Sequence, residues 1–290
     1  MIDRRDFILG GGAAVAALSF GDSPAYGVSP ALPIAIDPGG QLTQGGWLRG
    51  KVSPNVSALT LDGRPIPFAA DGKFLIAFDR DAGPAAQLVA IHTNGRSFAL
   101  PLAISPRAWK IEHINAARRP GGITDENYAR LRKAELARIS AARKIATKAQ
   151  GWRQDFIRPA PGRFSGRFGS QRVYRGQPGA YHSGLDIAGG ANTPFVAPAD
   201  GVVILAASAP FSLEGNLLMI DHGMGLNSAF LHSSQLLVSQ GDSVARGQAI
   251  GRIGQTGRAT GPHLHWSMKW HEHRIDPILM LRELVTDATR

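Results

Sequence analysis

Short apolar runs separated by glycine- and proline-containing turns dominate this sequence, and they constrain its fold more than any other feature. The 290 residues include 35 glycines and 19 prolines, but only 7% are aromatic. Glycine and proline interrupt helices and favour tight turns, so these counts predict a mainly β chain. At this length, with 43% hydrophobic residues, we expect two compact domains and a connector.

The absence of cysteine and the positive charge limit the classes of site and partner. Without cysteine there are no disulfides, thiolate metal ligands or cysteine nucleophiles, so any metal ion must be bound by His, Asp or Glu. A formal net charge of +10 favours an anionic partner such as cell wall, lipid headgroups or nucleic acid. Charge alone does not choose among these three.

Residues 1–27 have the pattern of an export signal. Arg4 and Arg5 precede an apolar stretch rich in glycine and alanine over residues 10–20, and small residues follow it. A bilayer span needs about 20 apolar residues, so no permanent membrane span is expected. The paired arginines resemble a twin-arginine signal, with a Sec signal that carries two arginines as the alternative. Either route predicts an exported protein, and the twin-arginine route suggests a Gram-negative periplasm.

Residues 28–108 predict an immunoglobulin-like β-sandwich. Asp-Gly and Asn-Gly pairs typical of hairpin turns separate its β-type runs, which cover residues 47–52, 58–61, 74–78 and 87–91. This part of the sequence contains no cluster of catalytic residue types.

Residues 109–158 predict a helical connector. Thr124, Asp125 and Glu126 form a helix start, and apolar residues follow at helical spacing from Leu131 to Ala149. Lysine and arginine fill most of the other positions. We interpret them as a solvated helix face, and a basic strip that grips an anionic polymer is the alternative.

Residues 159–290 predict a β domain that carries the chemistry, because seven of the nine histidines lie between His182 and His273. His182 and Asp186 flank a turn that leads into a strand. His263 and His265 are two residues apart, so a strand would point both imidazoles to one face. Imidazoles that converge beside a carboxylate predict a metal site.

Hydrolytic zinc sites commonly use three nitrogen or oxygen ligands and leave one position for water. His182, Asp186 and one histidine of the 263/265 pair would supply these ligands. The other histidine of that pair, together with His232, could then transfer protons near the metal ion. A neighbouring imidazole suits this role because zinc lowers the pKa of bound water toward about 7.

Residues 164–281 resemble the lysostaphin-type peptidoglycan endopeptidases, zinc metallopeptidases marked by H-x-x-x-D, a later H-x-[SNH] and H-x-H. The three motifs occur here in that order, in a β-rich setting. The resemblance implies an antiparallel sheet or barrel-like metallopeptidase domain that binds one Zn²⁺ per chain. One departure is that Leu226 and Phe230 stand where the family often has tyrosines before the central histidine.

The resemblance also assigns a role to each motif position. It implies that His182, Asp186 and His265 are the zinc ligands, and that His232 and His263 are the catalytic histidines. Together they would hydrolyse an amide with metal-activated water, without a covalent intermediate.

Three other positions lie near these motifs. Tyr181 directly precedes the first ligand and is a candidate substrate contact, with packing as the alternative. His222 is expected in a turn near the cleft, where it could also contact substrate. His271 and His273 imitate the H-x-H spacing, but we expect them in an exposed hairpin turn.

These features predict an exported zinc endopeptidase that hydrolyses peptide cross-links of peptidoglycan and binds its stem peptides. Family and compartment suggest the bond between D-Ala and meso-diaminopimelate, and glycine bridges stay open. The alternative is a non-catalytic scaffold of the same fold that binds the wall and activates a separate amidase. No nucleic-acid partner is expected, because no aromatic-basic recognition motif accompanies the charge. The oligomeric state is left open.

Overall fold

The computed structural model describes residues 32–116 and 126–281, and the export signal expected at residues 1–27 lies outside them. Within these residues α1 is the only α-helix, and strands make up most of the regular structure, which confirms the mainly β prediction. No helix of the described chain is long and apolar enough to cross a membrane. From Pro33 onward the described residues form one compact unit.

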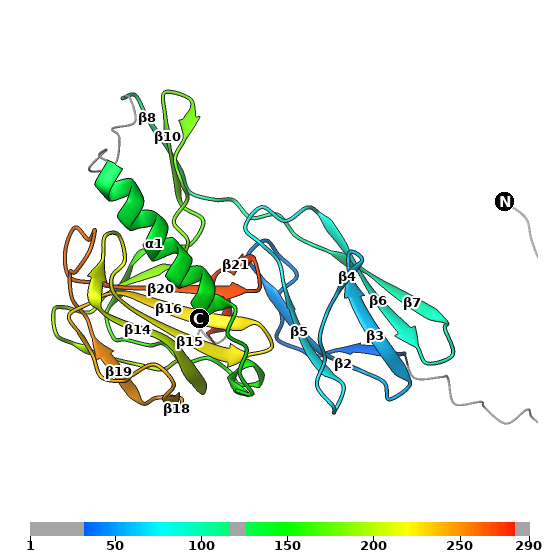
Figure 1. Cartoon of the computed structure of the whole chain (residues 1–290). Coiled ribbons are helices and arrows are strands. Elements are labelled where there is room, and N and C mark those ends of the chain that lie inside the picture. The colour runs from blue at the N-terminus through cyan, green and yellow to red at the C-terminus, as the bar shows by residue number, and fades with distance from the viewer. Residues whose placement is uncertain (1–31, 117–125, 282–290) are drawn as a thin grey trace, which may run out of the picture. The chain divides into compact units, whose positions relative to one another are not determined.

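The front domain consists of two antiparallel sheets that share a buried core (Figure 1). The first has the order β1-β2-β5, with bounds Ile34–Ile36, Trp47–Val52 and Lys73–Ala77. The second has the order β4-β3-β6-β7, with bounds Arg64–Pro65, Val56–Leu61, Ala85–His92 and Ser97–Ala103. The four expected β runs are all present, and Gly63 and Gly95 occupy the expected turns with positive φ.

The segment expected to be a helical connector is more varied than its sequence pattern indicates. It begins with strand β8 (Ile111–Ile114), which pairs in parallel with β10 (Gln171–Tyr174) of the following domain. Helix α1 covers only Glu126–Arg143, and a 3-10 turn follows at Gly151–Arg153. The helix of the connector is therefore present as α1, and a strand that was not predicted precedes it. There the β-branched residues at both ends of Ile-Glu-His-Ile fit a strand once a partner is available.

The basic residues of α1 do not all form a solvated face, because some of them bind side chains of the neighbouring sheet. Arg132 forms a bidentate pair with Glu214 at 2.7 and 2.8 Å and also contacts Glu135 at 2.9 Å. Glu135 is buried and accepts hydrogen bonds from Ser212. Arg143 donates to Asn227, and burial lowers its pKa to about 10. Charged side chains thus help to fasten the helix to the neighbouring sheet, since Leu131 and Leu136 are exposed and only Ala142 of its apolar residues is fully buried.

The carboxyl-terminal domain is built on an eight-stranded antiparallel sheet of order β18-β14-β15-β16-β20-β12-β9, with β21 paired to β20. In that order the strands cover Ser243–Val244, Gly201–Phe211, Gly215–Gly223, Leu226–Ser233, Leu264–Trp270, Leu185–Ala188 and Arg163–Gly166, and β21 covers His273–Ile275. A second sheet, of order β13-β19-β17, covers Pro194–Val196, Ala249–Arg252 and Gln235–Leu236. Strand β11 (Gln177–Pro178) pairs antiparallel with β10. A 3-10 turn covers Pro277–Met280.

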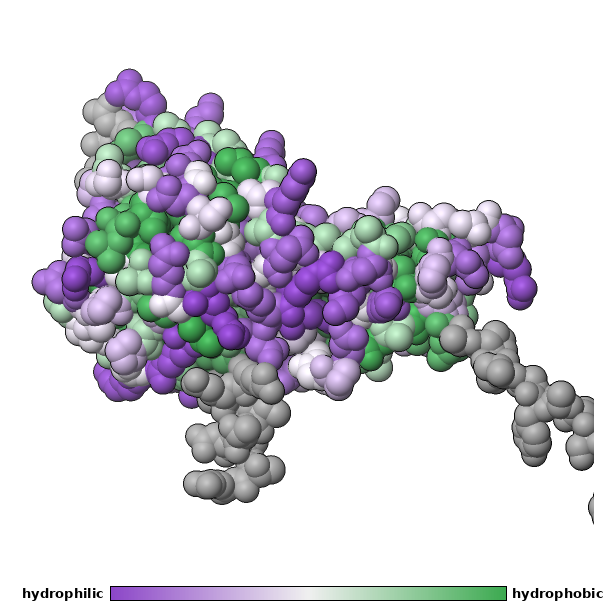
Figure 2. Space-filling view, turned by 90° about the horizontal axis from the view of Figure 1, so that it is seen from below, coloured by the Kyte–Doolittle hydropathy of each residue, from purple (hydrophilic) through white to green (hydrophobic). Residues whose placement is uncertain are grey.

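Both faces of the large sheet are buried at its centre. All nine residues of β15 are buried. Leu217 and Met219 belong to a cluster with Ala142 of α1, whereas Leu218 and Ile220 belong to the main core with Trp152. Covered sheets of this kind give continuous apolar strands, and the packed layers provide a rigid support for side chains at the strand ends. On the face seen in Figure 2 hydrophilic residues predominate, and hydrophobic residues form only small groups.

Candidate metal centre

Strand pairing brings two of the expected metal ligands together. Strands β12 and β20 are neighbours, and Asp186 and His265 are register partners across them. As a result Asp186 Oδ1 lies 2.8 Å from His265 Nδ1. Residues 79 positions apart in the sequence therefore meet because of backbone hydrogen bonding, which fixes their separation.

The third expected ligand, His182, lies just before β12 and is oriented by a loop. Its Nδ1 is 3.1 Å from the Arg167 carbonyl oxygen. A carbonyl can only accept, so Nδ1 carries the proton and Nε2 keeps its lone pair. His182 Nε2 then lies 3.1 Å from Asp186 Oδ1 and 3.1 Å from His265 Nδ1. A backbone carbonyl behind the imidazole is the usual partner of a metal-binding histidine.

These three donor atoms fit a tetrahedral metal ion. Among the described residues, His182, Asp186 and His265 form the only group of three such side chains with donors close enough to share an ion. Their separations of 2.8–3.1 Å approach the roughly 3.3 Å between ligands about 2.0–2.1 Å from a tetrahedral zinc. Two imidazoles with one carboxylate are also a donor set that zinc accepts.

The charges within the cluster favour an ionised carboxylate. Burial alone would raise the pKa of Asp186, but the adjoining imidazoles of His182 and His265 outweigh burial and hold that pKa far below its usual range. Burial lowers the pKa of His265, against the opposing effect of Asp186. The site therefore offers a negative ligand and a neutral imidazole, both in the form that binds a cation.

His232 and His263 form a second pair beside the cluster. Their ring centroids are 4.9 Å apart, and the His232 ring is 6.3 Å from that of His265. Each Nδ1 donates to a backbone carbonyl, at 2.9 Å to Thr256 for His232 and at 2.8 Å to Gly261 for His263. Both Nε2 atoms therefore keep a lone pair. His263 Nε2 lies 3.7 Å from Asp186 Oδ1, so this pair adjoins the three donors.

Gly166 and Gly184 make room for the cluster. A Cβ added at Gly184 would lie 2.7 Å from His265 Nε2 and 2.5 Å from the Trp266 carbonyl oxygen. A Cβ added at Gly166, on strand β9, would lie 2.3 Å from Asp186 Oδ2. A glycine beside a motif histidine was visible in the sequence, but only the structure shows that its missing side chain is needed.

An open groove of about 1070 Å³ adjoins the cluster, and His182 and Asp186 line it. Tyr181 also lines this groove, packed edge-on against Phe168 at 5.9 Å. Other lining residues come from the segment before β8 and from β10, and include Arg107, Trp109, Lys110, Arg172 and Tyr174. The structure therefore places Tyr181 where it both packs and faces the groove.

His222 does not reach the groove. It is fully buried in β15, where Nδ1 is 2.8 Å from the Asp200 carbonyl oxygen and Nε2 is 2.8 Å from Ser228 Oγ. Phe156 packs against its ring at 4.9 Å. With both nitrogens held by protein atoms, the ring has no free group for substrate. The expected turn near the cleft is replaced by a core position, because β15 is longer than its sequence pattern indicated.

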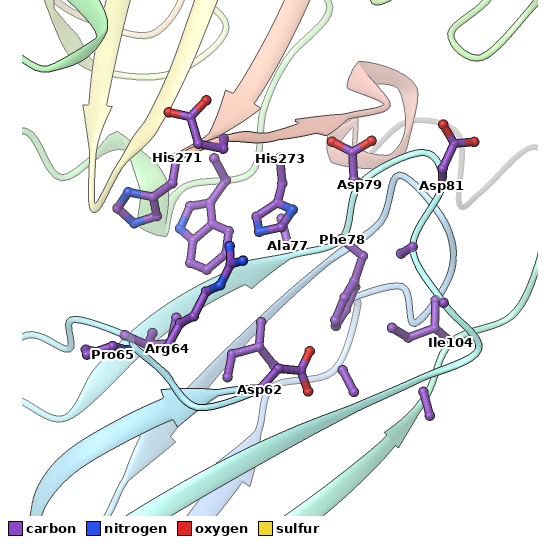
Figure 3. A pocket seen from close by; sticks show the side chains of 18 residues that line it. Asp62, Arg64, Pro65, Ala77, Phe78, Asp79, Asp81, Ile104, His271 and His273 are labelled. Carbon is purple, nitrogen blue, oxygen red and sulfur yellow. The ribbon is translucent and has the colours of Figure 1, made fainter.

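His271 and His273 lie at a separate cavity. His271 is exposed in the turn between β20 and β21, as expected. His273 was also expected to be exposed, but it is half-buried at the start of β21, where it stacks on Trp270 at 5.7 Å. The cavity has a volume of about 510 Å³ and is lined by this turn and by front-domain residues such as Phe78 and Asp79. Figure 3 shows both imidazole rings among its lining side chains. None of the expected ligands or catalytic histidines lines this cavity.

Comparisons with known proteins agree with the fold and with the cluster. Residues 180–277 match the model of peptidase family M23, as the sequence motifs predicted. A segment of 89 residues is 44% identical to peptidoglycan DD-endopeptidase ShyA of Vibrio cholerae, covering 31% of this chain and 20% of that protein. Another, of 97 residues, is 37% identical to the DD-carboxypeptidase/endopeptidase Mpg of Neisseria meningitidis, covering 33% and 22%.

One solved structure is similar over most of the chain. A protein from Pseudomonas aeruginosa assigned to peptidase M23 matches with a TM-score of 0.63 and 25% identity, covering 83% of this chain and 95% of that one. The similarity therefore extends beyond the peptidase domain. In contrast, the chain spans only about a fifth of the length of the two curated relatives.

Proposed function

We propose that this chain is an exported zinc endopeptidase that hydrolyses peptide cross-links of peptidoglycan. One observation carries the proposal: three donor atoms lie within 3.1 Å of one another, next to two imidazoles with free Nε2 atoms. His182, Asp186 and His265 would hold the ion. A bound zinc ion supplies Lewis-acid polarisation of the scissile carbonyl and an acidic water.

The second histidine pair would handle protons. Burial lowers the pKa of His232, so its imidazole is neutral near pH 7 and Nε2 can accept a proton. The hydrogen bond from Nδ1 to the Thr256 carbonyl fixes the orientation in which Nε2 does so. His263 is held in the same way by Gly261 and would stabilise negative charge on the amide oxygen or return a proton to the leaving amine.

The substrate class rests on the relatives and on the groove. ShyA is named as a peptidoglycan DD-endopeptidase, and Mpg as a DD-carboxypeptidase/endopeptidase. The groove is open, so an extended peptide can enter it. Several cationic side chains line it, and they would attract the carboxylates of such a peptide. We assign the bond between D-Ala and meso-diaminopimelate as the target, with the periplasm as the compartment.

Digestion of purified peptidoglycan tests this proposal. The protein, lacking residues 1–27, is incubated with peptidoglycan from sources with direct and with glycine cross-links, with and without a chelator, and the fragments are analysed by mass. We expect dimeric muropeptides with direct cross-links to become monomers, and chelator to stop the reaction. Metal binding and wall binding without new peptide termini would instead support the scaffold alternative and overturn the proposed activity.

A further inference from the structure

We propose that Arg80, in the front β domain, is a positioning residue for the metal ligand His182. It would act through the loop of residues 167–170, which lies between the two side chains. The inference rests on the metal centre of the proposed function, and it gives the front domain a role in building that centre. Neither Arg80 nor the loop lies within residues 180–277, which match the family model.

The loop holds His182 through three hydrogen bonds. The His182 amide donates to the Ser170 carbonyl at 2.8 Å, and its own carbonyl accepts from the Gly169 amide at 2.9 Å. The third bond joins His182 Nδ1 to the Arg167 carbonyl at 3.1 Å. Since β12 begins only at Leu185, this loop is the main support of both the backbone and the ring of this ligand.

Arg80 holds the same loop from the opposite side. Its Nε and Nη2 donate to the Gly169 carbonyl at 3.2 and 3.0 Å, and Nη2 also donates to Gln171 Oε1 at 3.1 Å. Gly169 therefore accepts from Arg80 through its carbonyl and donates to His182 through its amide. The Arg80 residue is only 6% exposed, so its contacts are little weakened by solvent. A planar guanidinium suits two adjacent acceptors, which an ammonium would serve less well.

Aromatic rings keep Arg80 and the loop in place. The Arg80 guanidinium lies 4.7 Å from the Tyr181 ring centroid and 5.3 Å from that of Trp109. Trp109 also packs edge-on against Phe168 at 5.7 Å. A Cβ added at Gly169 would lie 2.1 Å from a Trp109 ring atom, so the loop has little room to shift on that side. The 167–170 loop is thus enclosed by Arg80 and Trp109, which precede residues 180–277, and by Tyr181, which lies within them.

Arg49 provides a matched control. It is a half-buried arginine of the front domain that likewise donates to a backbone carbonyl of the following segment, that of Gln154. Its guanidinium stacks on Trp47 at 4.6 Å. Within the residues that the structure describes, Arg49 forms no hydrogen bond or ion pair with the 167–170 loop or with the metal ligands. Loss of Arg49 should therefore disturb the junction between the domains without altering His182.

The test compares Arg80→Met, Arg80→Lys and Arg49→Met with the parent, each without residues 1–27. Zinc affinity is measured by competition with a chromophoric chelator, and the ligand field by the visible spectrum of the cobalt-substituted protein. We expect Arg80→Met to bind zinc about 10–100-fold more weakly, as for other partners behind a metal ligand, and to shift the cobalt bands. Arg80→Lys should fall between this variant and the parent. Arg49→Met should stay within about twofold of the parent, because distant sites act independently.

Two results would overturn the inference. One is an Arg80→Met protein with the affinity and cobalt spectrum of the parent, and the other is an equal loss of affinity in Arg49→Met. If Arg80→Met does not fold, Arg80→Lys decides, and unchanged affinity and spectrum in that variant also reject the inference. Failure of the proposed function is separate, because it would appear as absent zinc binding or absent wall digestion in the parent protein.

Discussion

Asp186 and His265 are register partners on β12 and β20, and their donor atoms lie 2.8 Å apart. Two of the three proposed ligands are therefore fixed by the pairing of two strands in a buried sheet. The third, His182, depends on a loop. The proposed metal centre consequently has one side set by strand pairing and one side set by the 167–170 loop.

Replacement of Asp186 by asparagine should abolish tight metal binding. The amide keeps the shape of the side chain but removes its charge, and loss of a direct ligand should exceed the 10–100-fold cost of losing a supporting partner. We expect zinc affinity to fall by more than about 100-fold in chelator competition. Asp242→Asn is the control, because Asp242 caps an exposed turn at Ser239. Parent-like affinity in Asp186→Asn would contradict the ligand assignment.

Replacement of His263 by alanine should separate catalysis from metal binding. Its imidazole adjoins the three donors without belonging to them, so zinc content should be unchanged. Loss of an acid-base group should lower kcat on cross-linked muropeptides by about 10²–10⁴-fold. His232→Ala should behave alike, and His92→Ala in the front domain should keep full activity. Retained activity in either active-site variant would exclude that histidine from proton transfer.

Replacement of Gly184 by alanine should damage the site through steric contact. The added Cβ would press on His265 and on the Trp266 carbonyl, and such overpacking costs about 1–3 kcal/mol of unfolding free energy. Gly261 is the matched control, since a Cβ there meets no atom within 4 Å. Chemical unfolding and zinc affinity of both variants check the prediction. Equal effects at the two glycines would show that packing against His265 is not the cause.

The buried His222 should make stability depend on pH. Burial lowers its pKa from 6.5 to about 4, so between these values the unfolded chain binds a proton that the folded chain does not. The stability that neutral His222 contributes is complete above about pH 6.5 and decreases as the pH falls. At pH 4 the decrease amounts to about 3 kcal/mol of unfolding free energy. Urea unfolding of the metal-free parent and of His222→Gln should show a shallower pH dependence in the variant. Parallel curves would contradict the prediction.

Motif spacing was sufficient to predict which side chains the fold brings together at the candidate site. His263 and His265 are two residues apart, and the structure brings both beside Asp186. The Asp-Gly and Asn-Gly turns likewise indicated hairpins that the front domain contains. Such features are local, so propensity and spacing determine them without knowledge of the tertiary fold.

Other features depend on contacts between distant residues and could not be predicted in this way. The register that pairs Asp186 with His265 is set by the whole sheet. His222 looked like a turn residue because its burial depends on Phe156 and Ser228, which lie elsewhere in the sequence. Strand β8 forms because it pairs in parallel with the edge of β10. The short sequence of β8 alone does not predict this partner.

The most direct test of the central claim is a crystal structure of the zinc-loaded protein with anomalous data collected at the zinc absorption edge. We predict one strong anomalous peak per chain, about 2.0–2.2 Å from His182 Nε2, Asp186 Oδ1 and His265 Nδ1. A peak at His271 and His273 instead, or no peak among the three donors at saturating zinc, would contradict it.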